Sequence, residues 1–142
     1  MKRPRISASL RAKITAAAKH RCGYCQTQII VIGSFLTVDH IVPLAAGGKT
    51  EENNLWLACN SCNIYKGDRT HYDDPQSGLS VALFNPRTQE WDEHFLWSGD
   101  GIFILGKTEV GRATIDALKL NNEYIVRSRR RWVSVGWHPP QA

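Results

Sequence analysis

Residues 22–25 read Cys-Gly-Tyr-Cys and residues 59–62 read Cys-Asn-Ser-Cys, and these two segments hold all four cysteines of the chain. A two-residue spacing lets a tight turn aim both thiolates at one tetrahedral centre. Two such turns complete a closed site of four sulfurs. The sequence therefore predicts that one structural Zn²⁺ ion is bound by Cys22, Cys25, Cys59 and Cys62.

Disulfides and a redox pair are the competing uses of these cysteines. A redox pair needs only one of the two motifs. Disulfides need an oxidising compartment, but the basic N-terminus, Met-Lys-Arg-Pro-Arg, is not followed by the apolar stretch of an export signal. The longest aliphatic run, residues 29–32, is too short to cross a bilayer. We therefore expect a cytoplasmic protein with reduced thiols and no membrane span.

The residues between the two cysteine pairs suit phosphodiester hydrolysis. Such a reaction needs a divalent ion to neutralise the phosphate and a base to deprotonate water. His40 suits the second task because the pKa of histidine lies near neutral pH. Oxygen ligands from Asp39 and Asn63 would hold a magnesium-like ion and leave positions for water and phosphate. Taken alone, the Asp39-His40 pair near Pro43 is more often a turn with its own hydrogen bonds, and Asn63 could be a polar helix residue near a cap.

The motifs together resemble the HNH endonuclease family. The likeness covers about residues 22–67 and rests on Asp39-His40-Ile-Val-Pro43, Gly47-Gly48, Asn54-Leu55 and Cys59-x-x-Cys62-Asn63-x-x-Lys66-Gly67.

This resemblance implies a zinc-stapled ββα-metal fold and an endonuclease that leaves a 5′-phosphate and a 3′-hydroxyl. It implies that His40 is the general base, that Asp39 and Asn63 bind the catalytic ion, and that Asn54 orients His40 through backbone contacts. The third name-giving position of the family is often His, and Asn63 in its place favours Mg²⁺ or Mn²⁺ over softer metals.

The charges of the chain are segregated. The net charge is +5, yet the first 38 residues hold seven Lys or Arg and no acid, and the segment after Glu123 holds four arginines and no acid. Cationic flanks favour a polyanionic partner, although solvated basic faces are the alternative. The resemblance to HNH endonucleases implies that this partner is DNA, with RNA left open. The predicted phosphate contacts are Lys66, Arg127, Arg129, Arg130 and Arg131.

The hydrophobic pattern predicts an α+β protein. A helix capped by Ser9 is expected to about Lys19, followed by strands over residues 29–32, 35–38 and 55–58 and a helix from Asn60 to about Gly67. The second half predicts an antiparallel meander over residues 79–84, 91–97 and 101–105. Two helices then follow, one capped by Thr108 and one after Asn121-Asn122. Residues 1–72 are the expected nuclease core and residues 73–142 its support, and both are expected to form one compact unit.

Three functions remain in competition. The first is a metal-dependent endonuclease that nicks DNA as a monomer, or cuts both strands as a homodimer. The second is a non-catalytic zinc module that binds nucleic acid, which has no use for Asp39, His40 and Asn63 together. The third is a zinc-stabilised protein-interaction domain, which does not need acid-free cationic flanks. The other histidines (His20, His71, His94 and His138) lack comparable neighbours and are expected to be structural or exposed.

Overall fold

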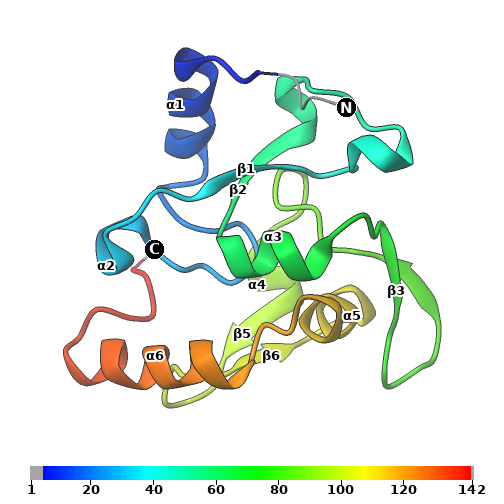
Figure 1. The fold of residues 1–142 in the computed structure, drawn as a ribbon. Coiled ribbons are helices and arrows are strands. Elements are labelled where there is room, and N and C mark those ends of the chain that lie inside the picture. Colours follow the sequence, from blue (N-terminus) through cyan, green and yellow to red (C-terminus); the bar gives the residue numbers. More distant parts are fainter. Residues whose placement is uncertain (1–4, 142) are drawn as a thin grey trace.

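The computed structural model describes residues 5–141 and confirms an α+β protein of helices and short strands (Figure 1). The first half contains α1 (Ala8–Ala17), α2 (Ile29–Ile32), β1 (Thr37–His40), two 3₁₀ turns (Leu44–Ala46 and Glu52–Asn54), β2 (Leu55–Ala58) and α3 (Asn60–Lys66). The second half contains β3 (His71–Asp73), β4 (Ser80–Ala82), α4 (Trp91–His94), β5 (Phe95–Trp97), β6 (Ile104–Gly106), α5 (Glu109–Leu118) and α6 (Glu123–Ser134). The first four residues of the basic N-terminal flank lie outside the described part.

The expected order of strand, loop, strand and helix is present in β1, β2 and α3. β1 and β2 are antiparallel, with Thr37 opposite Ala58 and His40 opposite Leu55. Cys59 caps α3 because its sulfur accepts a hydrogen bond from the amide of Cys62 at 3.4 Å. The helix ends at Gly67, whose φ of +54° is readily adopted only by glycine. This unit places the ends of β1 and α3 close together.

Three expectations for the first half were wrong in detail. The strand expected over residues 35–38 runs from Thr37 to His40. Residues 29–32 form the single helical turn α2 and not a strand, because the amides of Ile32 and Gly33 donate back to the carbonyls of Gln28 and Ile29. Gly33, in the left-handed conformation with φ +66°, ends that turn. A short apolar run cannot be assigned to strand or helix by its pattern alone. The cap of α1 is Ser7, whose hydroxyl accepts from the amide of Leu10, and not Ser9.

The predicted three-stranded meander was also wrong, since the described strands of the second half form two separate hairpins, β3 with β4 and β5 with β6. The turn of the first hairpin is fixed by Asp74, whose buried carboxylate accepts from the amides of Gln76 and Ser77 and from Arg112 of α5 at 2.9 Å. Residues 91–94 form the helical turn α4 before β5 begins. The cap expected at Thr108 is present, and the last helix follows Asn121-Asn122 as expected, with Asn122 as its cap.

The main core joins both halves of the chain. Cys22, Tyr24 and Leu57 from the first half pack in one buried cluster with Phe84 and Leu118 from the second. α3 lies between the β1–β2 hairpin and α5 (Figure 1). The C-terminal segment returns to the start of α2, where the Gln28 side chain donates to the carbonyl of Trp137 at 3.0 Å. No helix in the described part is long and apolar enough to cross a bilayer.

Arg129 is an interior residue, and its prediction as a phosphate contact was wrong. Its side chain is 0% exposed and donates to the carbonyls of Ile102 and Leu120, at 3.1 and 2.7 Å, and to the side chain of Asn121 at 3.1 Å. The guanidinium also lies 5.3 Å from the ring centre of Trp97. Its position on the inner face of α6 makes Arg129 the link between that helix and the β5–β6 hairpin.

We predict that Arg129→Lys lowers the free energy of unfolding by about 3 kcal/mol, because an ammonium cannot reproduce the forked contacts to three separate oxygens. Arg127→Lys, at an exposed position on the same helix, is the control and should change stability by less than about 0.5 kcal/mol. Urea denaturation of the zinc-loaded protein measures both. Equal stability of the two variants would contradict this role.

Candidate metal centre and active site

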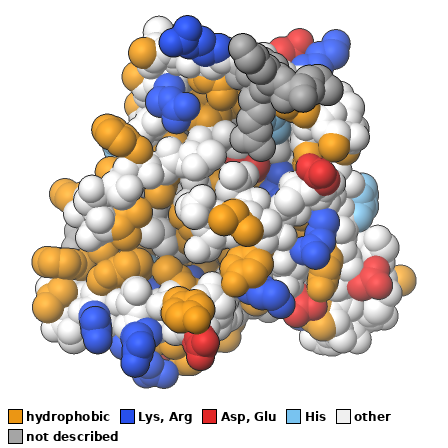
Figure 2. Space-filling view, viewed as in Figure 1, with side chains coloured by type: hydrophobic (Ala, Val, Ile, Leu, Met, Phe, Trp, Pro, Cys, Tyr) orange, Lys and Arg blue, Asp and Glu red, His pale blue; other side chains and the backbone are white. Residues whose placement is uncertain are grey.

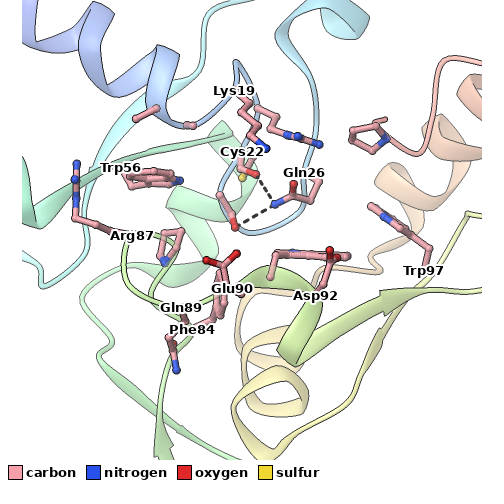
Figure 3. A pocket seen from close by; sticks show the side chains of 17 residues that line it. Lys19, Cys22, Gln26, Trp56, Phe84, Arg87, Gln89, Glu90, Asp92 and Trp97 are labelled. Carbon is pink, nitrogen blue, oxygen red and sulfur yellow. Dashed lines mark hydrogen bonds between the residues drawn. The ribbon is translucent and has the colours of Figure 1, made fainter. Parts of the chain in front are cut away.

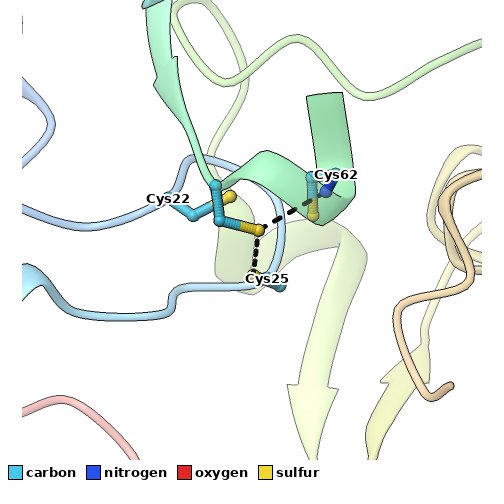
Figure 4. Close-up of side chains that lie close together, drawn as sticks. Cys22, Cys25 and Cys62 are labelled. Atoms are coloured by element: carbon cyan, nitrogen blue, oxygen red, sulfur yellow. Dashed lines mark hydrogen bonds between the residues drawn. The ribbon is translucent and has the colours of Figure 1, made fainter. Parts of the chain in front are cut away.

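The four cysteines converge on one point. Their sulfur atoms all lie within 4.8 Å of one another, and Cys22, Cys25 and Cys62 are buried (Figure 4). All four are free thiols, and the 3.5 Å between the sulfurs of Cys25 and Cys59 exceeds a disulfide bond of about 2.05 Å. Sulfurs held about 2.3 Å from a tetrahedral zinc would lie about 3.8 Å apart. The donor set therefore fits a structural Zn²⁺ site.

The electrostatics of the cluster also call for a cation. Hydrogen bonds from Cys22 and the other thiols hold the pKa of Cys25 well below its usual value. Burial raises the pKa of Cys22, and the hydrogen bond with Cys22 raises that of Cys62. A divalent metal ion is what would allow all four sulfurs to be deprotonated together.

Local backbone contacts shape the first cysteine motif, residues 22–25, which we call the first knuckle. The amide of Cys22 donates to the carbonyl of Thr27, and that of Gly23 to the carbonyl of Leu57, both at 2.9 Å. Gly23 packs so closely against Trp56 that no side chain would fit there. The second motif, residues 59–62, is the second knuckle and forms the start of α3. The two knuckles therefore bind the N-terminal loop to the β2–α3 junction.

Asp39 and His40 lie at the end of β1, and each is only 6% exposed. One carboxylate oxygen of Asp39, Oδ2, accepts from the hydroxyl of Tyr24 at 3.2 Å and lies 3.3 Å from Nζ of Lys66. Burial raises the pKa of Asp39, and the charge of Lys66 opposes that rise. Tyr24 belongs to the first knuckle, so the cysteine cluster and Asp39 are joined through one side chain.

Lys66 is inside the protein, and this placement contradicts its prediction as a phosphate contact. Its side chain is 2% exposed, and Nζ donates to the carbonyl of His40 at 2.9 Å in addition to its ion pair with Asp39. The last turn of α3 faces the end of β1, which turns the lysine inward. Lys66 therefore clamps the backbone and side chain of the Asp39-His40 pair.

Asn54 closes the loop that follows His40. Its side-chain oxygen accepts from the amide of Val42 at 2.9 Å, and its Nδ2 donates to the carbonyls of Val42 and Lys49 at 3.0 and 2.9 Å. A side chain at Gly48 would collide with the carbonyl of Val42, so this crossing requires glycine. Asn54 thus holds the backbone at Val42, two residues beyond His40. The predicted role of Asn54 in orienting His40 requires backbone contacts of this kind.

His40 has a further contact that the sequence did not suggest. Its Nε2 lies 2.8 Å from the hydroxyl of Thr50 at the far side of the same loop. Thr50 and Tyr24 are both absent from the set predicted from sequence. Neither stands in a motif spacing that identifies it, since both are brought to the site by the tertiary structure.

Asn63 is half-buried on α3, one turn before Lys66. Residues three apart share a face of a helix, and Lys66 on that face reaches Asp39. The predicted ligands of a catalytic ion would thus offer one carboxylate and one amide oxygen from neighbouring elements. Oxygen donors of this kind fit Mg²⁺ or Mn²⁺.

The other predicted phosphate contacts and two of the other histidines lie away from the end of β1. Arg127, Arg130 and Arg131 are exposed on α6. Nδ1 of His94 forms a hydrogen bond with the hydroxyl of Thr108 at 2.7 Å, as expected of a structural residue. His138 is buried against Trp97 and Trp132, and burial lowers its pKa to about 4.

A separate cleft of about 460 Å³ lies beside the first knuckle (Figure 3). Trp56 and Arg87 stand on one side of it and Trp97 on the other, with Glu90 and Asp92 between them. The predicted active-site residues are not among those that line it. The cleft is therefore distinct from the end of β1.

These features define the class of this domain as a ββα unit with a four-cysteine metal centre. Comparison with known families agrees, because the model of the HNH endonuclease family matches residues 22–69. This part of the chain is thus an HNH domain, and the resemblance inferred from the motifs is confirmed. Neither a curated protein nor a solved structure gives a significant match.

We predict about one Zn²⁺ per chain and a large loss of stability on chelation, since binding to such sites contributes on the order of 10 kcal/mol. Cys62→Ser should lose the metal, whereas Ser61→Ala, its exposed neighbour, should keep it. Elemental analysis and thermal denaturation provide the measurements. Full zinc content in the Cys62→Ser protein would refute the four-cysteine site.

Replacing Lys66 with methionine should destabilise the protein by about 3–5 kcal/mol, because the buried carboxylate of Asp39 loses its partner. The matched control is Lys49→Met, where the lysine is exposed and little change is expected. Chemical denaturation of both variants tests the assignment. If the two are equally stable, Lys66 is not a buried clamp.

Proposed function

We propose that the protein is a metal-dependent endonuclease that hydrolyses phosphodiester bonds in DNA with His40 as the general base. The observation that carries this proposal is the meeting of Asp39 and His40 with α3 at the end of β1, inside the segment matched by the HNH family model. A binding module has no need for a buried histidine beside a buried carboxylate. A hydrolase uses both.

In the proposed reaction His40 removes a proton from a water molecule, and the water oxygen forms a bond to phosphorus. The bond from phosphorus to the 3′-oxygen breaks, and that oxygen takes a proton from solvent. The products are a 5′-phosphate and a 3′-hydroxyl. Asp39 and Asn63 would hold a Mg²⁺ or Mn²⁺ ion, which neutralises phosphate charge when bound.

Asn54 and Lys66 keep His40 in place while it works. Asn54 holds the backbone at Val42, and Lys66 holds the carbonyl of His40 itself. Because Oδ2 of Asp39 is engaged by Tyr24 and Lys66, the other oxygen, Oδ1, is the one that would bind the ion. Holding a base in one orientation removes an entropic part of the barrier.

The DNA backbone would be bound by the exposed arginines of α6, over which Lys and Arg side chains gather in Figure 2. With Arg129 and Lys66 inside the protein, the contacts retained are those of Arg127, Arg130 and Arg131. Contacts to phosphate give affinity that falls with salt and little sequence preference. RNA remains an alternative polyanion for the same surface.

We further propose that residues 73–142 support the HNH segment within one unit, as the shared core favours. One ββα unit offers one active site, so a monomer would nick one strand, and a homodimer would be needed to cut both. Free cysteines at the metal centre suit a reducing compartment such as the cytoplasm.

The proposal is tested with supercoiled plasmid and Mg²⁺ or Mn²⁺. Replacing His40 with alanine should slow nicking by roughly 10²- to 10⁴-fold, the usual contribution of a general base. His71→Ala, at an exposed position on β3, should nick like the wild-type protein.

Equal nicking by the His40 and His71 variants would indicate a contaminant and sink the mechanism. If none of the three proteins nicks, yet the wild type binds DNA tightly at low salt only, the chain is a non-catalytic zinc module for nucleic acid.

A further inference from the structure

Arg129 is a buried cation without an acidic side chain beside it. It is 0% exposed and takes part in none of the ion pairs among the residues that the structure describes. Its hydrogen-bond partners, two carbonyls and the amide oxygen of Asn121, are neutral, and its Nε has no partner in the described part. A buried charge is costly unless an opposite charge compensates it. The guanidinium therefore calls for a negative partner other than a carboxylate.

The loaded cysteine centre is a negative group of this kind. Four thiolates carry twice the charge of the Zn²⁺ ion that they would bind, so the complete centre is a dianion. Three of its ligands, Cys22, Cys25 and Cys62, are buried. An uncompensated dianion in the interior is costly for the same reason as an uncompensated guanidinium. Each of the two buried charges is thus suited to offset the other.

The packing around α6 brings the two charges together. Nη2 of Arg129 donates to the carbonyl of Leu120 at 2.7 Å, and Leu120 belongs to the same buried core cluster as three of the cysteines. Leu120 and the second knuckle line one cavity of about 240 Å³. Ser128 and Trp132, which stand beside Arg129 on α6, line the same cavity. This part of α6 therefore borders the cysteine centre.

The electrostatics of Arg129 agree with this placement. Burial lowers the pKa of its guanidinium, and the negative charges of the four cysteine sulfurs, with Cys25 first, oppose that fall. His138 packs against Trp97 as Arg129 does, but burial lowers the pKa of His138 to about 4, so this ring is uncharged at neutral pH. Lys119 lines the cavity but is exposed to solvent, which screens its charge. Among these three basic groups, Arg129 is the buried cation.

We propose that Arg129 is the counter-cation of the zinc centre, and that its guanidinium stabilises the charge of the four thiolates from outside their sulfur shell. The inference goes beyond the proposed nuclease function and does not depend on it. Arg129 forms no bond to the metal. With zinc bound, the guanidinium and the dianion lower each other's cost of burial. Zinc affinity should therefore depend on the charge at position 129, and not only on the hydrogen bonds of that side chain.

The absorption spectrum of the protein loaded with Co²⁺, in place of the colourless Zn²⁺, reports this charge directly. A cation outside the sulfur shell lowers the energy of the sulfur electrons more than that of the metal. The neutral variants Arg129→Met and Arg129→Gln should therefore shift the sulfur-to-cobalt charge-transfer band to longer wavelength. Arg129→Lys keeps the positive charge and should keep the band near its wild-type position. Lys119→Met, at the exposed lysine of the same cavity, is the matched control and should leave the band unchanged.

Zinc affinity, measured by competition with a chromogenic chelator, separates charge from packing. Arg129→Lys and Arg129→Met both lose the forked hydrogen bonds of the arginine. With a dianion nearby, the lysine variant should bind Zn²⁺ about 10-fold more tightly than the methionine variant. Without one, a buried ammonium is costlier than a buried thioether, and the order would be reversed. Arg129→Gln is neutral but donates hydrogen bonds, and it should bind zinc like Arg129→Met.

Two results would overturn the inference. One is a charge-transfer band at the same wavelength in all Arg129 variants, and the other is zinc binding by Arg129→Lys that is no tighter than binding by Arg129→Met. A wild-type protein that takes up neither metal would overturn it together with the four-cysteine site. Neither readout uses DNA, so the inference is decided whether or not the protein nicks plasmid.

Discussion

The convergence of four cysteine sulfurs is the constraint on which the rest of the structure depends. It joins a loop near the N-terminus to the start of α3, two segments that are more than thirty residues apart in the sequence. Each knuckle then carries a residue to the end of β1: Tyr24 from the first reaches the carboxylate of Asp39, and α3, which begins at the second, brings Lys66. The cysteine cluster thus holds the residues at the end of β1 in place without lying there itself.

Two cations that a surface would normally carry are used inside this protein. Lys66 neutralises a buried carboxylate and binds a backbone carbonyl, whereas Arg129 binds carbonyl and amide oxygens from the segments around β6 and α5. Buried charges are costly unless they are paired and fully hydrogen-bonded. Lys66 ties α3 to the end of β1, and Arg129 ties α6 to the segments around β6 and α5. An apolar side chain at either position would not make these connections.

The parts that could be predicted from sequence are those governed by short-range spacing. The two Cys-x-x-Cys motifs, the β1–β2–α3 order and the cap at Thr108 are local patterns, and the structure contains each of them. The failures depend on partners distant in sequence. Residues 29–32 lack a neighbouring strand to pair with, and the inward turn of Lys66 and Arg129 is decided by what packs around them. Tyr24 and Thr50 contact Asp39 and His40, but no motif spacing in the sequence predicts these contacts. The roles of Asp39, His40, Asn54 and Asn63 stay predictions.

The hydrogen bond from the indole of Trp91 to the carbonyl of Tyr24, at 2.8 Å, has a consequence for the order of assembly during translation. The HNH segment leaves the ribosome before the residues that pack against its first knuckle. Tyr24 receives this support only after Trp91 and the apolar residues of α5 have emerged. The HNH segment therefore reaches its final packing only when the second half of the chain is present.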